Sequence, residues 1–153
     1  MENVAETVAV TREITIDASP ETVWAYLVEP EKLTRWMGLS AQVGSAPGEI
    51  YRCVVNPTHT AIGEIVELDP PNRFVFTWGW EEVPGREVTV APGSSTVEIT
   101  LEPRGDTTLL RLHHFDLPAS LGDGHGRGWD HYLARLLVTA PGGDPGRDEW
   151  LQN

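Results

Sequence analysis

Alternation of hydrophobic and polar residues predicts a chain rich in strands. Residues 8–17 alternate with period two, which is typical of a strand with one buried face. Similar patterns occur in five later segments, at residues 48–55, 60–69, 73–80, 95–103 and 107–115. Turn residues such as Pro70-Pro71-Asn72 separate them, and the short spacing between strands favours an antiparallel sheet.

The spacing of hydrophobic residues becomes helical in two regions. After the first strand, Ser19 is placed to cap one short helix, and Pro30 starts a second. Near the end of the chain, apolar residues recur at positions 129, 132, 133, 136 and 137. Gly128, just before Trp129, is expected to let this helix lie close across the sheet. The glycine-rich residues 121–128 are expected to be a joint that lets the helix lift to admit a ligand.

The order of elements predicts an α+β domain of strand, two helices, about six strands and a final helix. A curved antiparallel sheet of about seven strands needs a cover for its hydrophobic face, and the last helix is long enough to supply it. A sheet wrapped around one helix leaves a volume between them, closed at one end by the short helices. Residues 1–140 are predicted to form a single domain, residues 141–153 a tail, and residues 81–93 a mobile loop or rim.

The balance of charged residues excludes some partners. The 153 residues include 11 basic and 23 acidic ones, so the net charge is −12. Such a surface repels nucleic acids and anionic membranes, and neither is expected as a partner. Neither a secretory signal nor a stretch apolar enough to span a bilayer is visible, so a cytoplasmic protein is predicted. An exposed sheet edge or the Trp150 tail could form a homodimer.

The histidines do not predict a metal site, although four of the five lie between residues 113 and 131. His113 and His114 are neighbours in a strand, so their side chains leave opposite faces. His125 and His131 lack the i, i+4 spacing that places two ligands on one helix face. Because a zinc site needs three or four convergent ligands, neither a metal nor another cofactor is expected.

Large apolar side chains supply the candidate binding site. These side chains come from the inward face of the sheet, from the second short helix and from the final helix. They would therefore face the enclosed volume. Individually such residues are more often packed core, but as a set they are the best prediction of a pocket lining. The predicted ligand-binding residues are Trp36, Met37, Tyr51, Cys53, Phe76, Trp78, Trp80, His114, Trp129, Tyr132, Leu133 and Leu136.

His114 and Cys53 are the members of this set that carry chemistry of their own. His114 shares a strand face with Leu110 and Leu112, where it is either a hydrogen-bonded core histidine or a polar group that orients a ligand. Cys53 is either a nucleophile beside His114 or inert packing, and packing is the more frequent role of a buried cysteine. No nucleophile-elbow, phosphate-loop or dinucleotide-binding motif occurs, so no catalytic residue is assigned.

Five segments together resemble the START-like superfamily, also called helix-grip or SRPBCC. They are ASPETVWAYLVEPEKLTRWMG (18–38), GEIVELDPPNRFVFTW (63–78), PGSSTVEITLEP (92–103), LRLHHFDLP (110–118) and GWDHYLARL (128–136). Within the superfamily, the chain is similar to the branch of the C-terminal domain of the activator of Hsp90 ATPase. The resemblance implies the helix-grip fold. Met37 stands where the family often has a second tryptophan, and methionine is a softer, more adaptable side chain.

The superfamily includes lipid carriers, hormone receptors, polyketide cyclases and co-chaperones, so the resemblance leaves three hypotheses of function. The favoured one is a protein that binds a small apolar molecule, lipid-like or aromatic, between sheet and helix. The first alternative is a cyclase/aromatase-like enzyme or small hydrolase in the same cavity, since a cyclase can act mainly by orienting a reactive chain. The second is a co-chaperone-like contact with an Hsp90-type ATPase.

Overall fold

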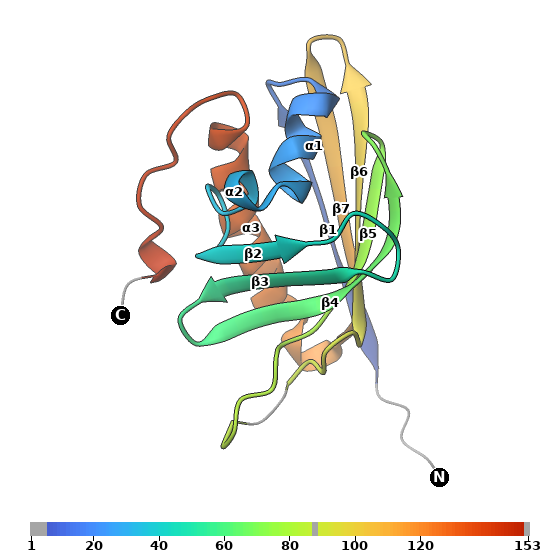
Figure 1. The fold of residues 1–153 in the computed structure, drawn as a ribbon, viewed down its shortest axis with the longest axis vertical. Helices are drawn as coiled ribbons and strands as arrows, with labels where there is room; N and C mark the ends of the chain where they lie inside the picture. The colour runs from blue at the N-terminus through green and yellow to red at the C-terminus, as the bar shows by residue number, and fades with distance from the viewer. Residues whose placement is uncertain (1–5, 87–88, 152–153) are drawn as a thin grey trace.

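A seven-stranded antiparallel sheet curves around one long helix. The computed structural model describes residues 6–86 and 89–151, and Figure 1 shows their arrangement. Along the sheet the strands are ordered β1-β7-β6-β5-β4-β3-β2, with β1 and β2 at the edges. In chain order the elements are β1 (Thr7–Ile16), α1 (Pro20–Val28), α2 (Pro30–Leu33), β2 (Ser40–Val43), β3 (Ile50–Asn56), β4 (His59–Asp69), β5 (Arg73–Trp78), β6 (Ser95–Arg104), β7 (Thr107–Pro118), η1 (Ala119–Leu121), α3 (Gly122–Thr139) and η2 (Glu149–Leu151).

The predicted α+β helix-grip fold is confirmed. The long helix α3 lies against the concave side of the sheet, and α1 and α2 cover the same side (Figure 1). The Ser19 hydroxyl accepts a hydrogen bond from the Thr22 amide at the start of α1, as expected of a capping residue. The four-residue strand β2, too short to show alternation, pairs with β3 and completes the sheet.

The hydrophobic core lies between the sheet and the three helices. Alternate residues of the long strands are buried there, as their period-two pattern predicts. These include Tyr51 and Cys53 of β3, Phe74 and Phe76 of β5, Val97 and Ile99 of β6, and Leu110, Leu112 and His114 of β7. The fully buried His114 is therefore on the core face of its strand, as predicted.

Helix α3 begins at Gly122 rather than at Trp129, so the expectation of a glycine-rich joint before the helix is wrong. Packing on β1 overrides the weak helix propensity of glycine. A Cβ atom on Gly122 would lie 2.7 Å from Cγ2 of Val8, and one on Gly126 would lie 2.7 Å from Nη2 of Arg12. The bare backbone at these two positions lets the first turns of α3 lie directly against β1.

Two further expectations about the helix need correction. Gly128 is not a point of close approach, since a Cβ atom there would meet no heavy atom of the described residues within 4 Å. Leu137, placed in the apolar stripe by its spacing, is 40 % exposed, because it lies on the edge of α3 that faces away from the sheet. The remaining stripe residues, Trp129, Tyr132, Leu133 and Leu136, are buried.

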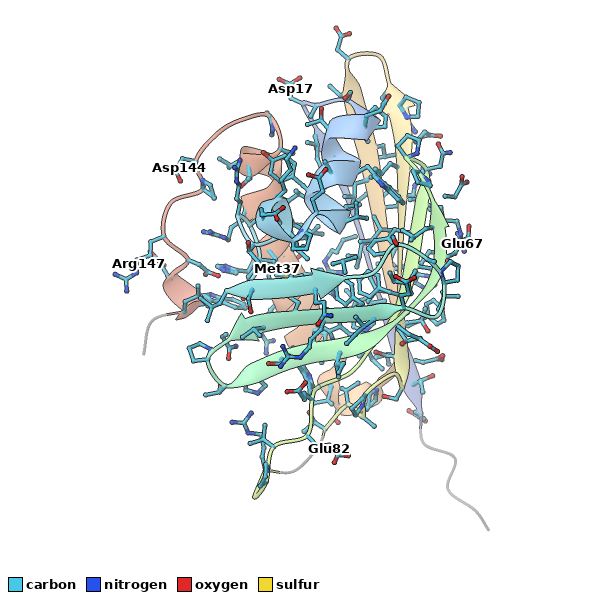
Figure 2. All side chains as sticks on the ribbon, viewed as in Figure 1. Asp17, Met37, Glu67, Glu82, Asp144 and Arg147 are labelled. Atoms are coloured by element: carbon cyan, nitrogen blue, oxygen red, sulfur yellow. The ribbon has the colours of Figure 1, made fainter. Side chains whose placement is uncertain are left out.

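The segment after α3 returns along the helix and packs on it. Asp148 is buried, and its Oδ1 lies 2.7 Å from Nε2 of His131. The Trp150 ring stacks on the His131 imidazole with 3.9 Å between centroids and 3° between planes. Asp144 and Arg147, by contrast, point outward from this segment (Figure 2). Trp150 thus docks on α3.

In the described parts of the chain, none of the helices combines the length and the hydrophobicity needed to cross a bilayer.

Candidate functional site

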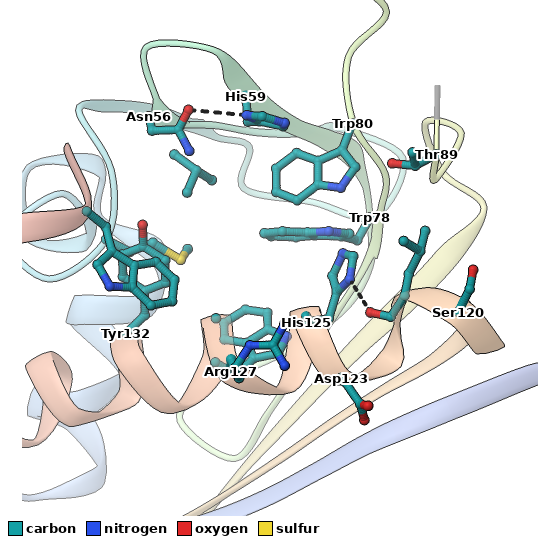
Figure 3. Close-up of a pocket in the computed structure, with 17 residues that line it drawn as sticks. Asn56, His59, Trp78, Trp80, Thr89, Ser120, Asp123, His125, Arg127 and Tyr132 are labelled. Atoms are coloured by element: carbon teal, nitrogen blue, oxygen red, sulfur yellow. Dashed lines mark hydrogen bonds between the residues drawn. The ribbon is translucent and has the colours of Figure 1, made fainter. Parts of the chain in front are cut away.

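A cavity of about 670 Å³ lies at one end of the space between sheet and helix. Its walls come from the first half of α3, the β3–β4 turn, the residues around the end of β5, and the tail (Figure 3). Volumes of several hundred cubic ångströms are typical of sites for small molecules. The cavity is therefore large enough to hold one ligand of that size.

Four tryptophans and a tyrosine form most of the apolar lining, together with Met37. Trp78 ends β5, and Trp80 follows it on the same side of the chain, with 5.4 Å between their ring centroids. Across from them, the Trp129 ring of α3 lies 5.5 Å from Trp78. Such rings offer large apolar surfaces and prefer aromatic neighbours. Trp150 of the tail also borders the cavity, although half of its surface is exposed.

The structure divides the predicted ligand-binding residues into two groups. Those that line the cavity are Met37, Trp78, Trp80, Trp129 and Tyr132. Those that lie in the packed core beside it, none more than 3 % exposed, are Trp36, Tyr51, Cys53, Phe76, His114, Leu133 and Leu136. The second group supports the walls, because it fixes the positions of the strands and of α3 from behind.

Several lining residues were not predicted, and most of them are polar. They are Val55, Asn56, His59, Thr89, Ser120, Leu121, Asp123, Gly124, His125, Arg127, Gly128 and Trp150. Most lie in turns, in the tail or in the first turns of α3, where hydrophobic periodicity gives no signal. One signal was present: His125, Trp129 and Tyr132 are spaced i, i+4 and i+7, which places them on one face once the helix is extended to Gly122.

His114 is held by a directed chain of hydrogen bonds. The Trp129 indole N–H donates to Nδ1 of His114 over 3.0 Å, so Nε2 carries the proton and donates to Oγ of Ser95 over 2.9 Å. The Ser95 hydroxyl in turn donates to the main-chain carbonyl of Trp78 over 2.7 Å. Burial, reinforced by the nearby His125 and His113, lowers the pKa of His114 to about 3. The neutral imidazole therefore connects Trp129 to the Trp78 backbone and has no nitrogen left for a ligand.

His125 and Trp78 each have a polar atom without a partner. Nδ1 of His125 donates to the Leu121 carbonyl over 2.9 Å, which leaves Nε2 as an acceptor. Burial lowers the pKa of His125, partly opposed by this hydrogen bond, so the neutral form is favoured. Within the described residues, neither Nε2 of His125 nor Nε1 of Trp78 forms a hydrogen bond, and both atoms are buried. The cavity wall thus contains one unsatisfied acceptor and one unsatisfied donor, and each is costly to leave unpaired.

Cys53 is fully buried, and its thiol does not face the cavity. Burial raises the pKa of the Cys53 thiol to about 12, so the reactive thiolate is suppressed at neutral pH. Its Sγ lies 3.9 Å from the Met37 carbonyl. The environment matches the inert-packing interpretation. Over residues 6–86 and 89–151, no cluster of three or more His, Cys, Asp or Glu side chains could hold a metal ion.

The curved sheet, the long helix and the cavity between them define the helix-grip class of proteins. Residues 17–140 match the family model of the activator of Hsp90 ATPase homolog 1-like proteins, and the chain belongs to this family. No functionally curated protein matches the chain.

Solved structures agree with this assignment. The AHSA1-like protein of Rhizobium etli is 42 % identical over 100 % of this chain and 94 % of its own, with a TM-score of 0.75. The crystal structure of DynU16, a protein in the dynemicin biosynthetic locus, is 20 % identical over 92 % of this chain and 50 % of its own, with a TM-score of 0.77. The Aha1 dimer of Colwellia psychrerythraea is 17 % identical over 89 % of this chain and 98 % of its own, with a TM-score of 0.75. The last two similarities show the shared fold.

Proposed function

We propose that the protein binds a small, mainly apolar aromatic molecule in the cavity between α3 and the sheet. The observation that carries the proposal is the lining: Trp78, Trp80, Trp129, Tyr132 and Trp150 surround about 670 Å³. Aromatic side chains provide large contact area with few rotatable bonds, so they bind flat apolar ligands at a low entropic cost. Among small apolar molecules, an aromatic ligand fits this lining better than a flexible lipid chain.

The polar atoms of the wall support a ligand that is not a pure hydrocarbon. Nε2 of His125 accepts and Nε1 of Trp78 donates, and neither has a partner among the described residues. Both side chains line the cavity (Figure 3). A ligand hydroxyl or carbonyl that reaches either atom would remove the cost of its desolvation, which is about 1–3 kcal/mol. The ligand class is therefore an aromatic molecule with a polar substituent.

The other two hypotheses gain less support. The enzyme hypothesis loses its first candidate residue, because both nitrogens of His114 are engaged inside the protein. A co-chaperone role is suggested by the family description alone. The homodimer stays a prediction. The similar Colwellia psychrerythraea protein is a dimer, which is consistent with it. Ligand binding is the function that the geometry favours.

Titration with two aromatic probes and one fatty acid tests the proposal. N-phenyl-1-naphthylamine and 2-naphthol should bind the native protein, and palmitate should bind more weakly or not at all. Replacing a wall residue, Trp80→Ala, should weaken probe binding by about tenfold, since a buried aromatic contact is lost. The matched control is Val66→Ala, because Val66 is 49 % exposed and lies outside the cavity. A native protein that binds neither aromatic probe would contradict the proposal.

A further inference from the structure

The first turns of α3 contain four glycines, at positions 122, 124, 126 and 128. Glycine within a helix is unfavourable compared with alanine, because it loses the most backbone freedom on folding. Each of the four therefore needs a reason. For Gly122 the reason is packing, since a Cβ atom there would come within 2.7 Å of Cγ2 of Val8. For Gly126 the neighbour at 2.7 Å is Nη2 of Arg12, the far end of a long side chain that lies over this turn and pairs with Asp130.

Packing does not explain why positions 124 and 128 are glycine. A Cβ atom on Gly128 would meet no heavy atom of the described residues within 4 Å, and one on Gly124 would have Nη2 of Arg127 at 3.9 Å. Neither residue is in the left-handed region that favours glycine. Both, however, line the cavity. Because 124 and 128 are one helical turn apart, they form a continuous strip of bare backbone on that side of α3.

We propose that Gly124 and Gly128 set the size of the cavity, and that a planar aromatic ring of the ligand lies against this bare strip of helix. The inference rests on the proposed function and deepens it. Trp78 and Trp80 lie across the cavity from the first turns of α3 (Figure 3). The ring would then be held between tryptophan side chains and helix backbone, in the space that side chains at 124 and 128 would occupy.

Unpaired polar atoms at the same place point independently to a ligand. Trp78 is 4 % exposed and lines the cavity, and its Nε1 lacks a hydrogen-bond partner within the part of the chain described. His125 lies between the two glycines in sequence, and its Nε2 is likewise unpaired there. The Trp80 and His125 ring centroids are 5.9 Å apart, so His125 packs beside one of the tryptophans across from the strip. The ligand class is a planar aromatic molecule with a hydroxyl or carbonyl group at its edge.

Substitutions that fill the strip test the inference. Gly128→Leu should raise the dissociation constant of N-phenyl-1-naphthylamine by about tenfold or more, because side chain and probe compete for the same space. The smaller 2-naphthol should lose less affinity. Ala134→Leu is the matched control, since Ala134 is exposed on α3 and does not line the cavity. It should leave both dissociation constants within about twofold of those of the native protein.

Alanine variants distinguish the glycines that pack on β1 from those that line the cavity, and they do so without a ligand. They also test the inference if Gly128→Leu fails to fold. Gly128→Ala and Gly124→Ala should each raise the melting temperature by about 2–4 °C, through better helix propensity. Gly122→Ala should lower it, because the new methyl group meets Val8. A fall in melting temperature for Gly128→Ala would overturn the inference, since the glycine would then have a structural role.

The binding results distinguish this inference from the proposed function. If the native protein and Gly128→Leu bind both probes equally well, the glycine strip does not shape the site, although ligand binding itself stands. If the native protein binds neither probe, the proposed function fails and the inference is overturned with it. If Gly128→Leu loses N-phenyl-1-naphthylamine binding and the Ala134→Leu control does not, the result supports both the proposed function and the role of the glycine strip.

Discussion

Protonation of His114 should destabilise the folded protein, and the effect can be isolated by substitution. In the fold, burial lowers the pKa of His114 to about 3, whereas an unfolded chain gives histidine a pKa of about 6.5. The folded state therefore binds fewer protons than the unfolded state between these values. The contribution of His114 to stability is fully present above about pH 6.5 and is lost as the pH falls toward 3.

The magnitude follows from the width of that window. Each pH unit within it lowers the free energy of unfolding by about 1.4 kcal/mol, so the loss between about pH 6.5 and 4.5 is roughly 2–3 kcal/mol. The structural cause is the hydrogen-bond chain, since a protonated Nδ1 could no longer accept from the Trp129 indole. Protonation would also place a charge among fully buried side chains.

The assay is urea unfolding, followed by circular dichroism, at several pH values between about 7.5 and 4.5. His114→Gln does not titrate, and its amide can still donate to Ser95. At pH 7.5 it should be less stable than the native protein by about 1–3 kcal/mol, because the buried Trp129 N–H loses its acceptor. That gap should shrink by roughly 2–3 kcal/mol at pH 4.5. Contributions of titrating groups that do not interact with His114 are common to both proteins and cancel, whereas those of the nearby His113 and His125 depend on its charge.

Two outcomes would refute this prediction. Native protein and His114→Gln could lose stability in parallel as the pH falls, which would mean that His114 does not titrate differently in the two states. The second outcome concerns the hydrogen bond from Trp129. In His114→Asn the side-chain carbonyl can replace Nδ1 as the acceptor, so this variant should be more stable than His114→Gln. The two variants could instead prove equally unstable, with the Trp129 environment unchanged in His114→Asn. The hydrogen bond from Trp129 would then not be a significant part of the cost.

Three further predictions concern residues outside this chain of hydrogen bonds. The Cys53 thiol should react with a disulfide reagent at pH 8 only as fast as the protein unfolds, because burial raises the pKa of the thiol to about 12. Rapid labelling of the native protein would contradict this prediction. Trp150→Ala should cost about 0.5–1.5 kcal/mol in urea unfolding, through loss of the stack on His131, and no change would mean that the tail contact is not stabilising. Gly38→Ala should lower the free energy of unfolding by more than about 1 kcal/mol, since φ is +86° there and a Cβ atom would lie 2.6 Å from the Val54 carbonyl oxygen. An unchanged urea midpoint would disprove this prediction.

The sheet could be predicted from the sequence because its strands are long and one face of each is buried. In β7, alternation places Leu110, Leu112 and His114 on the core side, and the structure buries all three completely. A shift of one residue would turn every one of them to the other face, so the pattern specifies the register strongly. The short strand β2 could not be predicted in the same way, since four residues provide little periodicity.

The start of α3 could not be predicted because tertiary packing, rather than local preference, determines it. A segment with four glycines in seven positions reads as a linker by helix propensity. It is helical here because Gly122 and Gly126 fit against Val8 and Arg12 of β1, and the Arg12–Asp130 ion pair at 2.6 Å links the same elements. The missing side chains that suggested flexibility are what permits the close contact.

The candidate site was predicted in part. Parity and helical spacing identified Trp78, Trp80 and Trp129, because each belongs to or directly follows a regular element. The polar rim comes from segments that are distant in the sequence, such as Asn56 in the β3–β4 turn and Trp150 in the tail. No local pattern indicates that such segments meet, since their proximity depends on how the loops and the tail return to the sheet.

The distribution of tryptophans gives the protein a built-in optical reporter. Of its six tryptophans, Trp78, Trp80, Trp129 and Trp150 border the same hollow. The Trp78 indole lies 5.4 Å from Trp80 and 5.5 Å from Trp129, so excitation absorbed by any of these three indoles is exchanged readily among them. A molecule that enters and absorbs in the emission range of indole would dim most of the intrinsic fluorescence at once. Occupancy can therefore be followed in real time in the purified, unlabelled protein.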